Sequence, residues 1–185
     1  MINPRSFFFA ALFAMAIALT GMPHSARAAT ASDIQQDSAQ ALRNLYKTNS
    51  IAADLSRKAK GILVFPNIVK GGFVLGGSYG EGELIEGGHV TGYYSSASGS
   101  IGFQLGAQSY SYVIFLMNDK ALRYLKETNG WEVGVGPTVV IVNTGAAKNL
   151  STTTMKDDAY AFIFGQQGLM AGISLEGSKI SHLDR

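Results

Sequence analysis

The segment GGFVLGGSYG, residues 71–80, decides the fold that we expect for this chain. Gly72, Gly76 and Gly80 recur at even spacing, so they share one face of an extended segment. A strand face with so little side chain lets another backbone come close or lets a sheet coil tightly. The glycines therefore predict a strongly curved β-sheet. The same spacing recurs at Gly102, Gly106, Gly134 and Gly136.

Short runs rich in β-branched and aromatic residues predict strands along most of the chain. They lie at residues 62–65, 71–79, 90–94, 100–107, 110–117, 131–135, 138–143, 158–164 and 169–175. The gaps between these runs are short, which favours antiparallel hairpins over parallel crossovers.

Helical patterns precede and interrupt the strands. Residues 32–35 have the form of a capping box, and apolar residues follow them at helical spacing. A second helix is expected after Ser50 and should end at Gly61, and a third should run from an N-cap at Asn118 to Gly130. The predicted fold class is therefore α+β: a strongly curved antiparallel β-sheet or barrel, with N-terminal helices and one inserted helix packed on it.

The first 28 residues have the three parts of a cleavable secretory signal. Arg5 supplies the positive start, an apolar run follows at residues 7–19, and residues 26–28 fit the small-residue cleavage rule. An uncleaved membrane anchor is the alternative, but a spanning helix needs about 20 apolar residues. We therefore expect a single domain over residues 29–185 that is periplasmic or secreted and able to lie on a membrane surface.

Removal of this signal changes the charge balance of the chain. The whole chain has 15 Lys and Arg against 13 Asp and Glu. Arg5 and Arg27 leave with the signal, so the remaining domain has 13 of each kind and no net charge. A nucleic-acid partner is therefore disfavoured, because that role needs a large basic footprint. The chain has no cysteine, which excludes disulfides, Cys-ligated metal sites and a thiol nucleophile.

One catalytic pattern occurs in the glycine-rich segment. Residues 76–80 match the G-x-S-x-G elbow of serine hydrolases with Ser78 as nucleophile, and Asp157 or Asp158 and His182 would complete a triad in chain order. The elbow requires a sharp strand-to-helix turn after the serine, whereas the residues that follow Ser78 have strand and turn chemistry. We therefore expect no enzymatic activity.

Two acidic clusters are candidates for a cation site. One consists of Glu81, Glu83, Glu86 and His89, and the other of Asp157 and Asp158. Carboxylates with a histidine suit a divalent cation, but this spacing matches no defined loop. Solvated turn charge is the favoured interpretation, and the cation question stays open. The chain has no nucleotide-binding glycine motif, and no cofactor is expected.

Basic residues gather near the start of the expected domain. Between residues 43 and 70, six basic side chains are opposed only by Asp54. They are Arg43, Lys47, Arg57, Lys58, Lys60 and Lys70. A basic amphipathic helix can lie on an anionic membrane, where each Lys or Arg contributes about 1 kcal/mol. A solvated helix face is the alternative, so composition alone leaves membrane binding open.

Long segments of the chain resemble the SYLF domain family. They are KAKGILVFPNIVKGGFVLGGSYGEGEL at residues 58–84, GSIGFQLGAQSYSYVIFLMNDKALRYL at 99–125, EVGVGPTVVIVNTGAA at 132–147 and DAYAFIFGQQGLMAGISLEGSK at 158–179. The resemblance covers nearly all of residues 29–185 in order.

The resemblance implies a non-enzymatic lipid-binding domain. Eukaryotic members of the family bind phosphoinositides through a basic or amphipathic N-terminal region, and some fungal members bind actin. By similarity, the basic region of this chain is the expected site: Lys58, Lys60 and Lys70 in the shared signature, Arg43, Lys47 and Arg57 in the lead-in.

The expected export signal changes which ligand this resemblance implies. An exported bacterial chain would meet neither actin nor phosphoinositides, so the expected ligand is an anionic phospholipid of the cell envelope. A structural or protein-interaction module, with an envelope protein as partner, is the alternative function.

Overall fold

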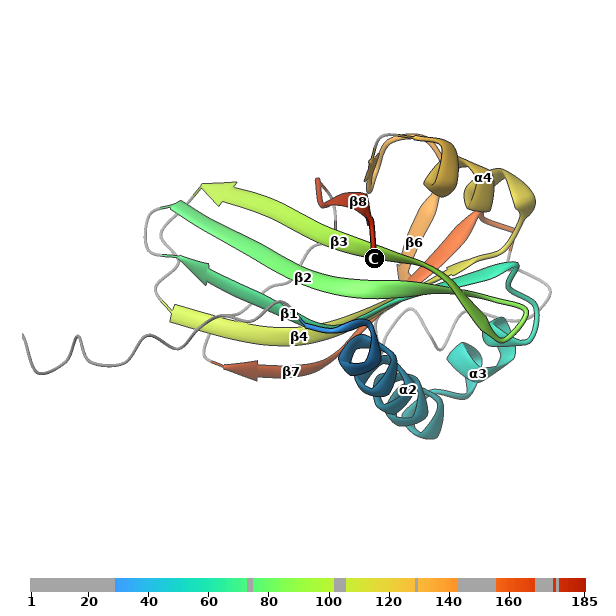
Figure 1. Cartoon of the computed structure of the whole chain (residues 1–185), viewed down its shortest axis with the longest axis horizontal. Helices are drawn as coiled ribbons and strands as arrows, with labels where there is room; N and C mark the ends of the chain where they lie inside the picture. Colours follow the sequence, from blue (N-terminus) through green and yellow to red (C-terminus); the bar gives the residue numbers. More distant parts are fainter. Residues whose placement is uncertain are drawn as a thin grey trace, which may run out of the picture.

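The computed structural model describes residues 29–72, 75–101, 106–128, 130–142, 156–168, 175 and 177–185. The expected export signal, residues 1–28, lies outside these ranges, and so do residues 169–174 of the last predicted strand. The described residues form one curled sheet with three helices, which confirms the α+β prediction (Figure 1).

Eight strands of the described part of the chain form a single sheet, in the order β5-β8-β3-β2-β1-β4-β7-β6. The pairs are antiparallel, as predicted, except that β6 and β7 run parallel. The strands are β1 (Gly61–Gly72), β2 (Leu75–Glu86), β3 (His89–Ile101), β4 (Gly106–Leu116), β5 (Trp131–Glu132), β6 (Val139–Val142), β7 (Ala159–Gly168) and β8 (Lys179–Leu183).

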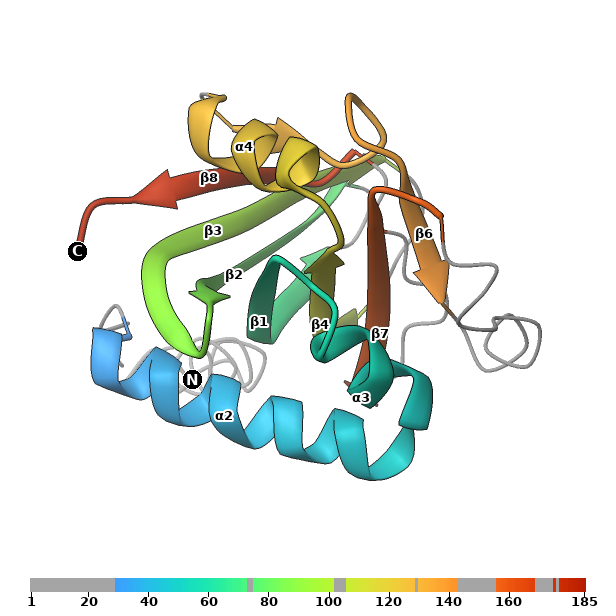
Figure 2. The ribbon, with the colours of Figure 1, turned by 90° about the vertical axis from the view of Figure 1, so that its right-hand side faces the viewer.

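The three helices lie on opposite sides of the curl. α2 (Ala31–Thr48) and α3 (Ser50–Ser56) cover its convex side, and α4 (Asp119–Glu127) lies across its open side (Figure 2). Two separate buried clusters follow this division. One joins α4 to the concave side of the sheet, and the other joins α2 and α3 to the convex side.

Strand β1 contributes to both clusters because it lies in the middle of the sheet. Leu63 and Phe65 belong to the concave cluster, whereas Val64 belongs to the convex cluster and Ile62 packs against it. A strand that is buried on both faces needs apolar residues at every position. This explains the uninterrupted apolar run that predicted a strand at residues 62–65.

The helix boundaries differ from the predicted ones in three places. α4 ends at Glu127 with Thr128 as its C-cap, and not at Gly130. The N-cap of α2 is Thr30 rather than Ser32: the Thr30 N–H donates to the Asp33 carboxylate at 2.9 Å, and the Asp33 N–H donates to Thr30 Oγ1 at 3.2 Å. α3 ends at Ser56, and Gly61 begins β1 instead of ending the helix. The predicted N-cap of α4, Asn118, is confirmed, since its side chain accepts from the Ala121 N–H.

The segment that was predicted as one strand, residues 71–79, belongs to two strands. Gly71 and Gly72 end β1, and they pair with Gly77 and Gly76 at the start of β2. Alternating glycines look the same in one long strand and on facing positions of a hairpin, so the local pattern did not distinguish the two. The short strand β8 was not predicted, and the predicted strand at residues 131–135 is limited to β5.

Strand β1 carries one extra residue at Pro66 and Asn67 relative to both of its neighbours. The register passes from Val64 to Asn67 against β2 and from Phe65 to Ile68 against β4. Such a bulge bends the strand and increases its twist. Proline is tolerated there because a bulged residue need not donate to the ladder.

Glycines on β2 allow the bulged strand to come close. A Cβ on Gly82 would fall on the carbonyl oxygen of Val64, and a Cβ on Gly80 would fall on the carbonyl oxygen of Asn67. Both positions also face the concave cluster, since a Cβ there would approach Phe65 and Ile68 as well. The alternating glycines of β2 thus allow β1 and β2 to approach closely at the bend.

We expect Gly82→Ala to destabilise the fold by about 1–3 kcal/mol, because the added methyl group overpacks the contact between β1 and β2. Chemical denaturation of both proteins measures the difference. Gly99→Ala on β3 is the matched control, because a Cβ at Gly99 meets nothing within 4 Å. Equal stability of the two variants would show that the close contact between β1 and β2 does not require glycine at position 82.

Candidate functional site

The basic side chains of α2 point away from the sheet. Arg43 and Lys47 are exposed, whereas Ile34, Ala41 and Leu45 of the same helix are buried. At 3.6 residues per turn, the two basic residues lie on the side of the helix opposite the buried ones. α2 therefore presents two cations on the outer surface of the molecule.

Three further cations follow α3 at the same end of the molecule. Arg57, Lys58 and Lys60 are all exposed, and Arg57 forms an ion pair with Asp54. Two backbone hydrogen bonds fix this segment, from the Lys58 N–H to Leu55 at 3.0 Å and from the Lys60 N–H to Leu116 at 2.8 Å. The predicted residues Lys58 and Lys60 are thus held at the junction of α3 and β1.

The sixth predicted residue, Lys70, lies apart from the other five. It stands near the far end of β1, so about ten residues of strand at about 3.3 Å each separate it from Lys60. Its cross-strand partners are Ser78 on β2 and Gln108 on β4. Lys70 therefore does not contribute to the basic surface of the helices.

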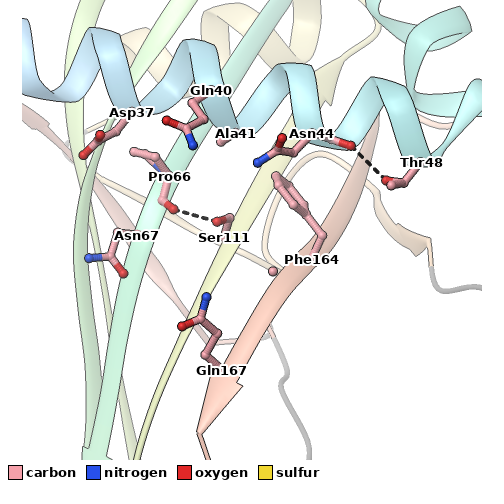
Figure 3. A pocket seen from close by; sticks show the side chains of 11 residues that line it. Asp37, Gln40, Ala41, Asn44, Thr48, Pro66, Asn67, Ser111, Phe164 and Gln167 are labelled. Atoms are coloured by element: carbon pink, nitrogen blue, oxygen red, sulfur yellow. Dashed lines mark hydrogen bonds between the residues drawn. The ribbon is translucent and has the colours of Figure 1, made fainter.

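A groove of about 560 Å³ runs between α2 and the convex side of the sheet (Figure 3). Asp37, Gln40 and Asn44 of α2 form one wall, and Asn67 of β1 and Gln167 of β7 lie on the sheet side. The remaining lining residues are Ala41, Thr48, Pro66, Ser111, Phe164 and Gly165. Sequence reasoning missed this site because its residues come from four separate elements.

A buried carboxyl group lies where α2 meets the sheet. Glu83 of β2 is 2% exposed, and its Oε2 has no hydrogen-bond partner among the described residues. Burial raises the pKa of Glu83 to about 7, and the neighbouring Ser38 hydroxyl of α2 opposes this effect only in part. Glu83 was expected to be a solvated turn residue, and that expectation is wrong because α2 covers it.

The first acidic cluster does not converge on one point. Glu81 pairs with Arg185, and Glu86 pairs with Lys126 of α4 at 2.7 Å, while His89 is exposed beside the hairpin turn. Within the described residues, no group of three His, Asp or Glu side chains is placed to hold a metal ion.

The second acidic cluster supports the start of α4. Asp158 accepts from Lys120 at 2.9 Å, from the Asn118 amide at 2.8 Å and from the Thr138 N–H at 3.1 Å. These bonds, led by the one from Lys120, lower the pKa of Asp158 to about 2. Asp157 bonds instead to the Tyr160 hydroxyl.

The hydrolase pattern does not form a nucleophile elbow. Ser78 lies inside β2, is buried, and its hydroxyl is 2.8 Å from that of Ser98 on the neighbouring strand. His182 is exposed on β8, where it faces Tyr94 and Asp184. The motif therefore lacks the strand-to-helix turn that the chemistry requires.

Because the Glu83 carboxyl is buried, we expect the folded protein to lose stability as the pH rises and this group ionises. Its folded-state pKa lies above the ordinary value of 4.5, so the folded protein binds the proton more tightly than the unfolded chain does. The contribution of Glu83 to stability is then fully present below about pH 4.5 and falls by about 3 kcal/mol as the pH rises through 7. The groups around Glu83 on β2 and β3 are Glu81, which is paired with Arg185, and Tyr93, whose hydroxyl accepts from Gln35.

Denaturation at a series of pH values checks this expectation. Glu83→Gln should remove the decline between pH 5 and 8 and should be more stable than the parent protein at pH 8. Glu127→Gln on the exposed end of α4 is the control and should keep the decline. Parallel pH profiles for the parent protein and Glu83→Gln would contradict the assignment.

The comparison with known proteins concerns the second half of the chain. Residues 97–184 match the family Ysc84, described as Las17-binding protein actin regulator. No curated protein matches the chain. The matched residues include the end of β3, all of β4 and α4, and β5 to β8. The Ysc84 family is known as a lipid-binding and actin-regulating domain and is generally non-catalytic. Over residues 97–184 the chain is thus similar to Ysc84, which is the SYLF family that its sequence resembles.

Proposed function

We propose that this chain is a non-enzymatic lipid-binding domain of the bacterial cell envelope. Residues 1–28 export it, residues 29–185 form the domain, and the outer surface of the N-terminal helices contacts anionic phospholipid. The match of residues 97–184 to a family known for lipid binding supports the ligand class.

One observation supports the outer surface of α2 as the lipid-binding surface. Arg43 and Lys47 lie on the side of α2 that faces away from the sheet, and α2 itself lies on the convex outside of the molecule (Figure 2). A flat anionic surface can approach these cations without any change in the fold. Lys58 and Lys60, exposed at the nearby junction of α3 and β1, extend the same basic surface.

The packing of α2 determines the kind of binding. Its apolar residues Ile34 and Leu45 are each 2% exposed because they pack against the sheet. They are unavailable for insertion into a bilayer while α2 stays docked. Binding is then electrostatic, and it weakens with salt because screening reduces the attraction between exposed charges. No helix of the described part of the chain is long and apolar enough to cross a membrane.

A second candidate function is a protein-interaction module of the envelope. The part of the sheet farthest from α3 consists of residues 68–72, 75–80, 96–101, 106–110 and 165–168, referred to as the distal end. Val69, Leu75 and Tyr79 are more than half exposed there, and Val69 stands directly opposite Tyr79. Lys70 is the one charged side chain among these residues. An exposed apolar patch of this kind marks an interaction site.

Co-sedimentation with vesicles tests the lipid function. The protein should bind anionic vesicles, bind neutral phosphatidylcholine vesicles weakly, and dissociate in high salt. Arg43→Gln with Lys47→Gln should weaken anionic binding about thirtyfold, since each cation near the surface contributes about 1 kcal/mol.

The matched control removes two exposed cations elsewhere. Arg123→Gln with Lys179→Gln changes the net charge equally but lies on α4 and β8. Equal loss in both double variants would mean that net charge, and not the surface of α2, governs binding. A protein that binds neither kind of vesicle would remove the lipid function and favour the protein-interaction module.

A further inference from the structure

The groove beside α2 holds four carboxamide side chains that converge from two walls. Gln40 and Asn44 project from α2, and Asn67 and Gln167 project from the sheet (Figure 3). The side-chain hydrogen bonds between described residues that line the groove are those of Ser111 Oγ to the Pro66 carbonyl at 2.6 Å and of Thr48 Oγ1 to the Asn44 carbonyl at 2.9 Å.

Neither bond uses a carboxamide group, and no other described residue bonds to the four amides. Each amide group offers one acceptor oxygen and two donor hydrogens. All four amide side chains are exposed, so the groove offers solvent-facing hydrogen-bonding groups that the described part of the protein does not use.

The regular pairing of the sheet is interrupted at this same place. β1 carries its extra residue at Pro66 and Asn67, and β7 carries an extra residue between its pairings at Phe164 and Gln167. Gly165 takes φ +64 at the second bulge, a left-handed conformation that glycine adopts without strain. The two bulged strands flank β4, and bulges of this kind re-aim side chains beside functional sites.

The charge of the groove excludes several ligand classes. Of the described residues that line it, none is basic, and Asp37 is the one carboxylate. A phosphate or another anion would meet no cation there and would be repelled by Asp37. A purely apolar ligand would make no use of the amide groups that line the groove. A neutral ligand with many hydrogen-bonding groups fits the lining.

Hydroxyl groups match this lining because each one both donates and accepts, as each amide group does. The half-buried ring of Phe164 adds an apolar surface beside the polar walls, against which the C–H face of a sugar ring can pack. The volume of about 560 Å³ lies within the range of small-ligand sites.

We propose that the groove between α2 and strands β1, β4 and β7 binds a neutral, polyhydroxylated group such as a sugar ring. This goes beyond the proposed membrane function, because Arg43 and Lys47 lie on the outward side of α2 and take no part in the groove. A soluble glycan and the head group of a neutral glycolipid share this chemistry, and the experiment separates them.

Two binding measurements on the purified protein form the test. In the first, NMR titration follows the amide signals of the groove against neutral oligosaccharides of glucose, galactose and N-acetylglucosamine. In the second, neutral phosphatidylcholine vesicles are compared with and without a neutral glycolipid. Binding in the first measurement assigns a soluble glycan, and glycolipid-dependent binding in the second alone assigns a lipid head group.

Variants locate the binding in the groove. Asn67→Ala with Gln167→Ala should weaken binding at least about tenfold, since two hydrogen-bonding groups are lost from one wall. Phe164→Leu keeps an apolar side chain but removes the ring, and it should weaken binding as well. Gln166→Ala is the matched control: Gln166 is an exposed glutamine next to Gln167 that does not line the groove, so its loss should leave binding unchanged.

Two results would overturn the proposal. One is the absence of binding both to the oligosaccharides and to the glycolipid vesicles. The other is sugar binding that the groove variants leave unchanged. Neither result bears on the binding of anionic vesicles, which is proposed to use Arg43 and Lys47 and none of the residues that line the groove, so failure of the groove and failure of the proposed membrane function remain distinguishable.

Discussion

The close contact of β1 with β2 is the constraint on which the rest of the structure depends. β1 contains one residue more than its neighbours at Pro66 and Asn67. The facing strand β2 has Gly80 and Gly82 there, because a side chain at either position would meet the backbone of β1. The bend created there curls the sheet, since a bulge increases the local twist. The curl gives the sheet a concave side for α4 and a convex side for α2.

The position of α2 on the convex side gives one helix three separate surfaces. Its buried surface rests on the sheet around Ser38 and Glu83, its flank with Gln40 and Asn44 faces the groove, and its outer surface carries Arg43 and Lys47. An α-helix projects side chains in all directions, so the roles proposed for the groove and for the outer surface need not compete for the same residues. What they share is the requirement that α2 stays docked.

Part of this arrangement could be predicted from the sequence, namely the features that local patterns encode. Short runs rich in β-branched and aromatic residues indicated most strands, and the side-chain chemistry of Asn118 indicated a helix start. The hairpin between β1 and β2 could not be separated from one strand, because facing glycines repeat the same spacing. Three features depend on which elements meet in space: the burial of Glu83, the distance of Lys70 from the helices, and the groove. Residues that are close in the sequence do not show which distant elements will pack together.

The buried carboxyl of Glu83 connects the stability of α2 to the proposed membrane surface. An anionic membrane carries a negative potential of about −30 mV, which lowers the local pH by about half a unit. Because the pKa of Glu83 lies at about 7, this difference increases the fraction of Glu83 that is protonated near neutral pH. The neutral form is the one that burial favours, so the proposed membrane contact would favour the docked position of α2. On the proposed function, the surface that attracts Arg43 and Lys47 would thereby also stabilise the helix that presents them.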